Sequence, residues 1–119
     1  MNNKNLSHAE WTGRAGHQKS VLFTEEDFDS KGTKAQVIKI QPGGKIEPHY
    51  HKVRTEAFLV LKGTGLITLG EETAECAEHD YMLCKPGTLH AFENKGNEDF
   101  MIAIFRVNDP GDIDMLWAN

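Results

Sequence analysis

The sequence predicts an all-β protein, a β-sandwich or β-barrel of one domain. Short apolar runs alternate with glycine-bearing turns at intervals of about 8 to 12 residues, which is typical of such folds. No stretch has the length and period of a long amphipathic helix, and the chain has no internal repeat or low-complexity segment. The 119 residues suit a single domain, and an apolar content of 39% is ordinary for a soluble globular protein.

The two ends of the chain are predicted to lie outside this domain. Residues 1–20 are polar without a clear period, so we expect a flexible N-terminal arm whose Trp11 docks onto the body or onto a second subunit. We interpret His8 and His17 within the arm as ordinary solvent-exposed histidines. Residues 109–119 form a tail that is expected to pack on the barrel or on a partner subunit.

The domain itself is predicted to span residues 21–108. It begins with a short strand at Val21 to Phe23. The segment Thr24 to Asp27 places a hydroxyl before three acidic residues, which suits one helical turn at most. The other predicted strands are apolar runs bounded by turn signals, at residues 35–41, 57–61, 66–69, 81–84, 91–92 and 100–107.

Charge and composition argue against several classes of function. A net charge of -5 without a basic counter-patch disfavours nucleic acid or an anionic membrane as the main partner. The longest uninterrupted apolar run, 100–105, is far shorter than the ~20 residues that span a bilayer. The N-terminus lacks a signal-peptide core, so we expect a cytoplasmic protein. Cys76 and Cys84 are too few for a disulfide scaffold and are interpreted as free thiols in or near the core.

Four side chains form a candidate metal site: His49, His51, Glu56 and His90. Successive side chains of a strand alternate between faces, so His49 and His51 point the same way and can reach one ion. Glu56 lies at an odd offset from His51, so a turn or bulge must fall within residues 52–55 if it is to join them. Imidazoles with one carboxylate are a ligand set that first-row transition metals favour.

The segment that contains the first three of these residues, GGKIEPHYHKVRTEAFLVLKG at 43–63, resembles the first motif of the cupin superfamily, G-x5-H-x-H-x4-E-x6-G. All of its positions are present: Gly43, His49, His51, Glu56 and Gly63.

The segment around His90 resembles the second cupin motif, G-x5-P-x-G-x2-H-x3-N, at Gly87, His90 and Asn94. It departs from that motif at two positions that shape turns. His79 stands where the opening glycine is usual, and Lys85 stands where the proline is usual.

The resemblance implies a small single-domain cupin with a conserved barrel, that is, a double-stranded β-helix or jelly roll. Its metal would be a divalent transition ion, and iron, manganese, nickel, copper and zinc all remain open. Four protein ligands around a six-coordinate ion would leave two open positions. Since the centre would carry a charge of about +1, it would attract an anionic bidentate ligand such as an α-keto acid, an enediolate or a sugar acid.

Strand parity extends the interpretation to neighbouring residues. Phe58 and Val60 share the parity of Glu56, and Phe92 shares that of His90, so these three are expected to keep the pocket apolar. Ala57, Leu59 and Leu61 would then point outward as an apolar face that needs a cover. We expect a homodimer, with coverage by the chain's own ends as the alternative.

Candidate groups for substrate binding or proton transfer are ambiguous. Glu47 shares the parity of the histidines and is expected near the mouth of the site, whereas Tyr50 is expected to face away. Arg54 and Arg106 are interpreted as solvated, with the holding of a substrate carboxylate as the alternative. Lys85 and His79 are expected in solvent.

Proteins that resemble cupins include dioxygenases, sugar-phosphate isomerases, decarboxylases and non-catalytic binding or storage proteins. We expect a metal-dependent cupin that acts on an oxygen-rich small molecule, with a dioxygenase slightly favoured over a sugar or sugar-phosphate isomerase. The alternative is a non-catalytic module that binds a metal and a small ligand.

Overall fold

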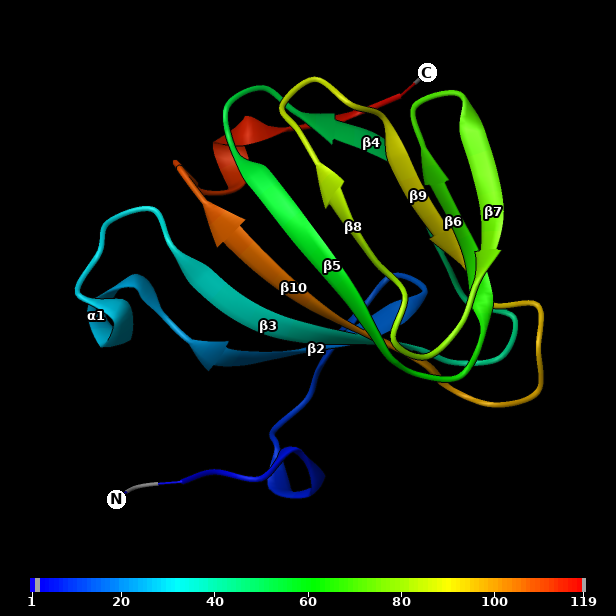
Figure 1. The fold of residues 1–119 in the computed structure, drawn as a ribbon, viewed down its shortest axis with the longest axis horizontal. Coiled ribbons are helices and arrows are strands. Elements are labelled where there is room, and N and C mark those ends of the chain that lie inside the picture. Colours follow the sequence, from blue (N-terminus) through cyan, green and yellow to red (C-terminus); the bar gives the residue numbers. More distant parts are fainter. Residues whose placement is uncertain (2, 119) are drawn as a thin grey trace.

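The computed structural model describes residues 1 and 3–118 as two antiparallel β-sheets that face each other (Figure 1). The first sheet has six strands in the order β1 (Thr12–Arg14), β2 (His17–Phe23), β3 (Lys34–Ile40), β10 (Phe100–Val107), β5 (Thr55–Lys62) and β8 (Tyr81–Cys84). The second has five, in the order β11 (Met115–Trp117), β4 (Lys45–His51), β9 (His90–Glu93), β6 (Gly65–Leu69) and β7 (Glu72–Cys76).

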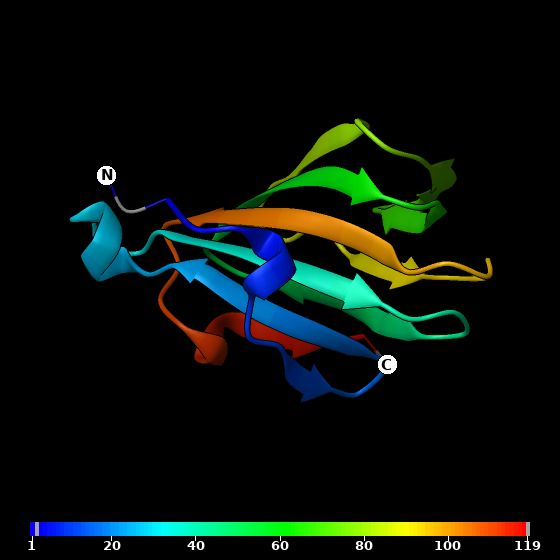
Figure 2. The ribbon, with the colours of Figure 1, turned by 90° about the horizontal axis from the view of Figure 1, so that it is seen from below.

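The topology confirms the prediction of an all-β jelly roll. Neighbours within a sheet are often distant in sequence, because β10 lies between β3 and β5, and β9 lies between β4 and β6. Figure 2 shows β2, β3 and β10 side by side, as in Figure 1. No helix among the described residues is long and apolar enough to cross a membrane.

Each predicted strand matches a strand of the structure, although the prediction at 35–41 extends one residue beyond the end of β3, and the predicted helical turn is α1 (Glu25–Phe28). The backbone N–H of Thr24 donates to the Asp27 carboxylate at 2.9 Å, which caps this turn. Strands β1, β7 and β11 are not among the predicted strands. Strand β7 reads ETAEC and is exposed except at Cys76, so it lacks the alternation of apolar and polar residues that reveals a half-buried strand.

The N-terminal segment contributes to the sheet before the predicted start of the domain. Strand β2 begins at His17, so the boundary at residue 21 falls within a strand. Before it lie a 3-10 turn, Leu6–His8, and the short strand β1. Trp11 docks onto the body, where the Nζ atom of Lys39 lies 4.1 Å from the centre of its ring.

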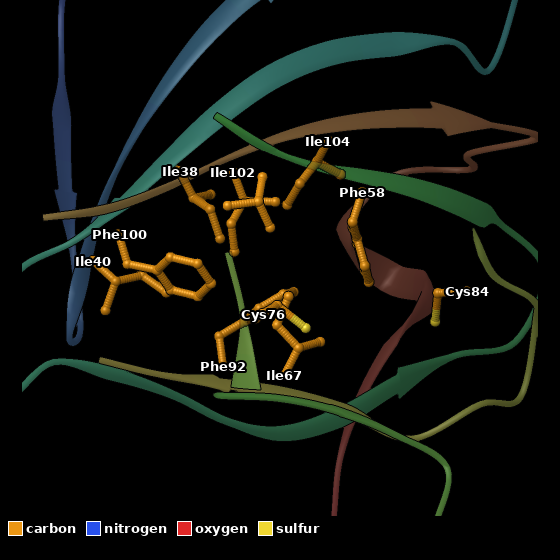
Figure 3. Close-up of a cluster of buried hydrophobic side chains, with 11 residues drawn as sticks. Ile38, Ile40, Phe58, Ile67, Cys76, Cys84, Phe92, Phe100, Ile102 and Ile104 are labelled. Carbon is orange, nitrogen blue, oxygen red and sulfur yellow. The ribbon is translucent and has the colours of Figure 1, made fainter. Parts of the chain in front are cut away.

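Apolar side chains from both sheets fill one part of the interior (Figure 3). Phe58 and Val60 are buried as parity predicts, and Phe58 packs between the sheets near Phe92 at a ring distance of 5.2 Å. Phe100 is fully buried and lies so close to Gly65 that a Cβ atom there would overlap its ring. The core cluster comprises Ile38, Ile40, Phe58, Val60, Ile67, Cys76, Cys84, Phe92, Phe100, Ile102 and Ile104. Both cysteines are free and buried, as predicted.

Candidate metal centre

Three of the predicted ligands meet at one end of the interior. The metal-binding nitrogens of His49, His51 and His90 lie within 4.8 Å of one another, and all three side chains are buried. Strand β4 carries His49 and His51 on one face, and its register with β9 places His49 directly opposite His90. Two neighbouring strands thus bring together three imidazoles that are far apart in sequence.

The hydrogen bonds of these rings indicate which of their nitrogens could bind a metal ion. The Nδ1 atom of His49 lies 2.8 Å from the carbonyl oxygen of Glu47, and that of His90 lies 3.1 Å from the carbonyl oxygen of Thr88. A carbonyl only accepts, so Nδ1 carries a hydrogen in both rings, and Nε2 has a lone pair whenever the ring is neutral. Nε2 of His90 is buried without a hydrogen-bond partner, and so is Nδ1 of His51. Nε2 of His51 accepts from a guanidinium nitrogen of Arg54 at 3.0 Å, so it faces the cluster with its lone pair engaged by that arginine. Unpartnered imidazole nitrogens in a buried cluster fit a transition metal ion.

Glu56 turns inward because the chain breaks where the sequence requires it. Strand β4 ends at His51 and β5 starts at Thr55, so the intervening bend resets the parity. The Oε1 atom of Glu56 lies 3.4 Å from Nε2 of His51 and 3.3 Å from Nε2 of His90. The carboxylate therefore lies beside two of the three histidines, in reach of an ion that they would hold.

Two arginines hold the other oxygen of this carboxylate, which corrects their interpretation as solvated residues. The Nε atom of Arg106 donates to Oε2 of Glu56 at 2.8 Å, and Nε of Arg54 lies 3.6 Å from the same oxygen. Only 3% of the Arg54 surface is exposed. Asp109 accepts from Arg54 at 3.2 Å and balances the second charge. Ile104 on β10 is buried, and Arg106 shares its parity, so the inward direction of Arg106 could have been inferred from the sequence.

The electrostatics of the cluster favour an ionised carboxylate and a neutral His49. Burial tends to raise the pKa of Glu56, but the close approach of the His51 and His90 rings and the charges of the two arginines hold it well below its usual range. Burial, aided by His90, lowers the pKa of His49 to about 4. Burial opposes protonation of His90 too, yet Cys84 and Glu56 raise its pKa to about 9. Metal ligands must be deprotonated, so an ion held here would compete with the proton of His90.

A residue that sequence reasoning missed secures the bend between His51 and Glu56. The Asp114 carboxylate, 4% exposed, accepts hydrogen bonds from three consecutive backbone N–H groups, those of residues 52, 53 and 54, at 2.9 to 3.1 Å. The following strand, β11, pairs with β4, and the ring of Trp117 lies 5.3 Å from that of His49. The C-terminal segment is thus part of the site. Asp114 and the bend lie some sixty positions apart in sequence, so no local pattern predicts their contact.

A cavity of about 630 Å³ opens from the histidine cluster. Of the predicted pocket residues, Phe92 lines it, whereas Phe58 and Val60 belong to the core cluster beneath. Ile38, Ile104, Met115 and Trp117 complete its apolar wall. Glu47 lines the mouth, as predicted, and its carboxylate lies 3.2 Å from Nζ of Lys45.

Two residues of the second motif lie where the sequence predicts, and one residue of the arm does not. His79 and Lys85 are exposed, as predicted. His79 has a φ of 79°, so it adopts the left-handed conformation that glycine adopts without strain. His17, in contrast, is not an ordinary solvent-exposed histidine, because it is half-buried and lines the cavity.

Comparison with known proteins identifies the family. The sequence model of the cupin domain matches residues 36–105, more than half of the chain. The chain belongs to the cupin domain family. The matched region contains all four predicted ligands of this cupin.

Two curated relatives are similar over part of their length. A mannose-1-phosphate guanylyltransferase of Salmonella typhimurium is 39% identical over 59 residues, 50% of the cupin and 12% of the transferase. An uncharacterized protein of Methanocaldococcus jannaschii is 35% identical over 69 residues, 56% of the cupin and 55% of that protein. The cupin thus spans a small part of the first relative and about half of the second.

Three solved structures share the fold at low sequence identity. A predicted oxalate decarboxylase from Thermotoga maritima superposes with a TM-score of 0.81 at 19% identity, over 87% of the cupin and 96% of that chain. A double-stranded β-helix protein from Klebsiella pneumoniae gives 0.80 at 19% identity, over 100% and 98%. A sugar phosphate isomerase from Silicibacter pomeroyi gives 0.75 at 17% identity, over 92% and 77%.

Proposed function

We propose that this cupin is a metal-dependent enzyme that acts on an anionic, oxygen-rich small molecule. The observation that carries the proposal is the buried cluster of His49, His51 and His90, in which Nε2 of His90 has no hydrogen-bond partner. His49 and His90 also line a cavity of about 630 Å³. These three residues would hold a divalent transition metal with Glu56 as the fourth ligand. The ion would supply a Lewis-acid or redox centre with open positions for a ligand.

The surrounding residues prepare the site for that ion. Arg106 and Arg54 hold one oxygen of Glu56, which keeps the carboxylate ionised and leaves Oε1 toward the histidines. The carbonyl of Glu47 fixes the tautomer of His49. The apolar wall that includes Phe92 limits the access of water to the reacting end of a ligand.

Oxygenation is the first candidate reaction. An oxygenase needs open metal positions and a cavity with apolar walls, and both fit the described residues. The carboxylates that line the cavity are Glu56, which the two arginines hold, and Glu47, which pairs with Lys45 at the mouth. Neither is placed as a free general base, which an isomerase would need.

Isomerisation of a sugar or sugar phosphate is the second candidate. It is favoured by His17, which lines the cavity and whose pKa is lowered by burial and by the charges of Arg14 and Lys19. A neutral imidazole is a competent base at pH 7. The likeness in fold to a sugar phosphate isomerase agrees with this candidate.

The experiment is a paired activity screen on tag-free protein reconstituted with each of iron, manganese, nickel, copper and zinc. We expect oxygen uptake that depends on an α-keto acid or a sugar acid, at a rate on the order of 1 s⁻¹. His51→Ala should abolish turnover. Interconversion of sugar phosphates without oxygen uptake would assign the second candidate. Metal and ligand binding without turnover in either assay would instead assign a non-catalytic binding module, and turnover that persists in His51→Ala would contradict the site.

We propose further that a second copy of the chain covers the outer face of β5. Ala57, Leu59 and Leu61 are partly exposed there, and the register places Leu83 of β8 and Phe105 of β10 beside Ala57. Leu83 and Phe105 are 55% and 44% exposed, and β8 is the edge of its sheet. An apolar patch at a sheet edge suits a two-fold pair.

Sedimentation equilibrium tests this dimer directly. The wild type should sediment as a dimer, and Leu83→Glu should shift it to a monomer because a charge is placed in the contact. A monomeric wild type at tens of micromolar concentration would contradict the proposal.

A further inference from the structure

Basic side chains gather on the hairpin formed by β1 and β2. Arg14 on β1 lies directly opposite His17 on β2, and Lys19 follows His17 on the same face of the strand. All three line the cavity that leads to the histidine cluster. Burial lowers the pKa of His17, and the positive charges of Arg14 and Lys19 lower it further.

The turn of this hairpin is packed against the strand that carries two of the metal-site histidines. Gly16 has a φ of 79°, and a Cβ atom at this position would overlap the backbone carbonyl of Lys45 on β4. A Cβ atom at Gly44 would overlap the carbonyl of Gly16 in turn. Only glycines permit this approach, which joins the hairpin of one sheet to β4 of the other at the mouth of the cavity.

The lining of the cavity is positive although the protein is negative. Five cationic side chains line it among the described residues, against two carboxylates, in a chain of net charge -5. Arg54 and Arg106 face Glu56 at its base, and Lys45 faces Glu47 at its mouth. The hairpin adds Arg14 and Lys19 to this lining. A cleft lined by one sign of charge concentrates ligands of the opposite sign.

We propose that the hairpin residues Arg14, His17 and Lys19 form a subsite for the anionic group of the ligand, a phosphate or a carboxylate. The anionic group lies at the mouth, and the part of the ligand that reacts lies at the histidine cluster. This subsite rests on the proposed function for the chemistry at the histidine cluster. It extends that function by predicting that the substrate is elongated and carries one or two negative charges. Arg14 and Lys19 supply the charge and donate the hydrogen bonds. The Nδ1–H group of His17 donates to the carbonyl oxygen of Ala15 at 3.1 Å, so this neutral ring forms a wall of the subsite between the two cations.

The test is a calorimetric titration of the purified, metal-containing full chain with inorganic phosphate and, separately, with malonate at low ionic strength. We compare the wild type with Arg14→Gln, Lys19→Gln and the double variant. Lys62→Gln is the matched control, since Lys62 is exposed at the end of β5, does not line the cavity and loses the same charge. Metal content and melting temperature are measured on the same samples.

We expect each single variant to bind the preferred anion about fivefold more weakly, and the double variant at least about tenfold more weakly. Lys62→Gln should stay within about twofold of the wild type, because a distant surface charge is screened. The anion with the larger dependence on Arg14 and Lys19 identifies the ligand as a phosphate or a carboxylate.

Equal affinity in the wild type and the double variant would overturn the subsite, as would equal weakening by Lys62→Gln. Failure of the subsite differs from failure of the metal centre. In the first case the metal content is normal, and the anion affinity does not depend on Arg14 and Lys19. In the second case the protein lacks metal, yet anion binding still depends on Arg14 and Lys19.

Discussion

The interior of the barrel has two halves that are built by the same strands. Apolar side chains fill one half, and buried polar and charged side chains fill the other. Along β5 the inward side chains run from Glu56 through Phe58 to Val60, and along β9 they run from His90 to Phe92. Strand β10 changes in the same direction, from Arg106 to the isoleucines and Phe100. The polar ends of these strands form the candidate metal centre, and the apolar ends form the core seen in Figure 3.

The two halves contribute differently to stability and function. Burial of apolar side chains stabilises the fold, roughly in proportion to the area removed from water. Burial of Glu56 and two arginines costs desolvation, which their mutual contacts offset. We therefore expect substitutions in the core to change the free energy of unfolding with little effect on bound metal, and substitutions around the centre to change metal affinity.

The largest expected effect lies in the apolar half. Phe100→Ala removes a fully buried ring against Gly65 and should lower the free energy of unfolding by about 3 to 5 kcal/mol. Urea denaturation followed by circular dichroism measures it. Metal bound per folded molecule should stay at the wild-type value. A loss below about 1 kcal/mol would show that the core relaxes around the cavity, and loss of metal from folded protein would break the separation of the two halves.

The second largest change in stability is expected where the C-terminal segment contacts the site. Asp114→Asn weakens the acceptor of three backbone N–H groups at residues 52–54 and should cost about 2 to 3 kcal/mol at pH 7. Burial tends to raise the pKa of Asp114, but these hydrogen bonds hold it below its ordinary value of 3.8. The stabilisation is therefore present above about pH 4 and is lost as the pH falls through the lower pKa of the folded state.

Urea unfolding of the wild type and Asp114→Asn at pH 7 and at successively lower pH measures this contribution. The difference between the two proteins should shrink in acid. Asp29→Asn is the control, since Asp29 is exposed with a φ of 52°, a conformation that asparagine also adopts. A difference that is constant with pH would contradict the role of the ionised carboxylate.

A smaller effect is expected from the arginine that orients Glu56. Arg106→Gln removes the 2.8 Å hydrogen bond to Oε2 while Arg54 remains near that oxygen. Groups that orient a metal ligand typically change affinity by about 10- to 100-fold. Competition with a chelator measures the affinity, and Arg14→Gln at the mouth should leave it unchanged. Equal affinities for the wild type and Arg106→Gln would remove Glu56 from the ligand set.

The sequence predicted the parts of the molecule that depend on local pattern. Parity on β5 predicts that Phe58 and Val60 point inward, and both are buried. The odd offset of Glu56 predicts a break within residues 52–55, and the structure has it at residues 52–54. The cupin motifs predicted which histidines meet, and a family match over residues 36–105 supports the fold. These features are encoded within a few residues of each other, or in a motif whose geometry is shared.

The parts that escaped prediction depend on contacts between distant segments. Asp114 reaches the bend from the far end of the chain, and a lone aspartate in a tail has no pattern that reveals this. Arg54 and Arg106 were assigned to solvent because charged residues usually lie there, and only the structure shows the carboxylate that they share. The sequence around His17 has the polar composition of a flexible arm. Its hairpin packs closely against β4, and composition does not reveal a contact between such distant segments.

The central claim is that His49, His51, Glu56 and His90 bind a divalent transition metal. Elemental analysis of tag-free protein beside the double variant His49→Ala/His51→Ala tests it most directly. We predict close to one equivalent of iron, manganese, nickel, copper or zinc in the wild type and its loss from a double variant that keeps its β-sheet spectrum. Absence of metal from the wild type, even after incubation with each ion, would contradict the claim.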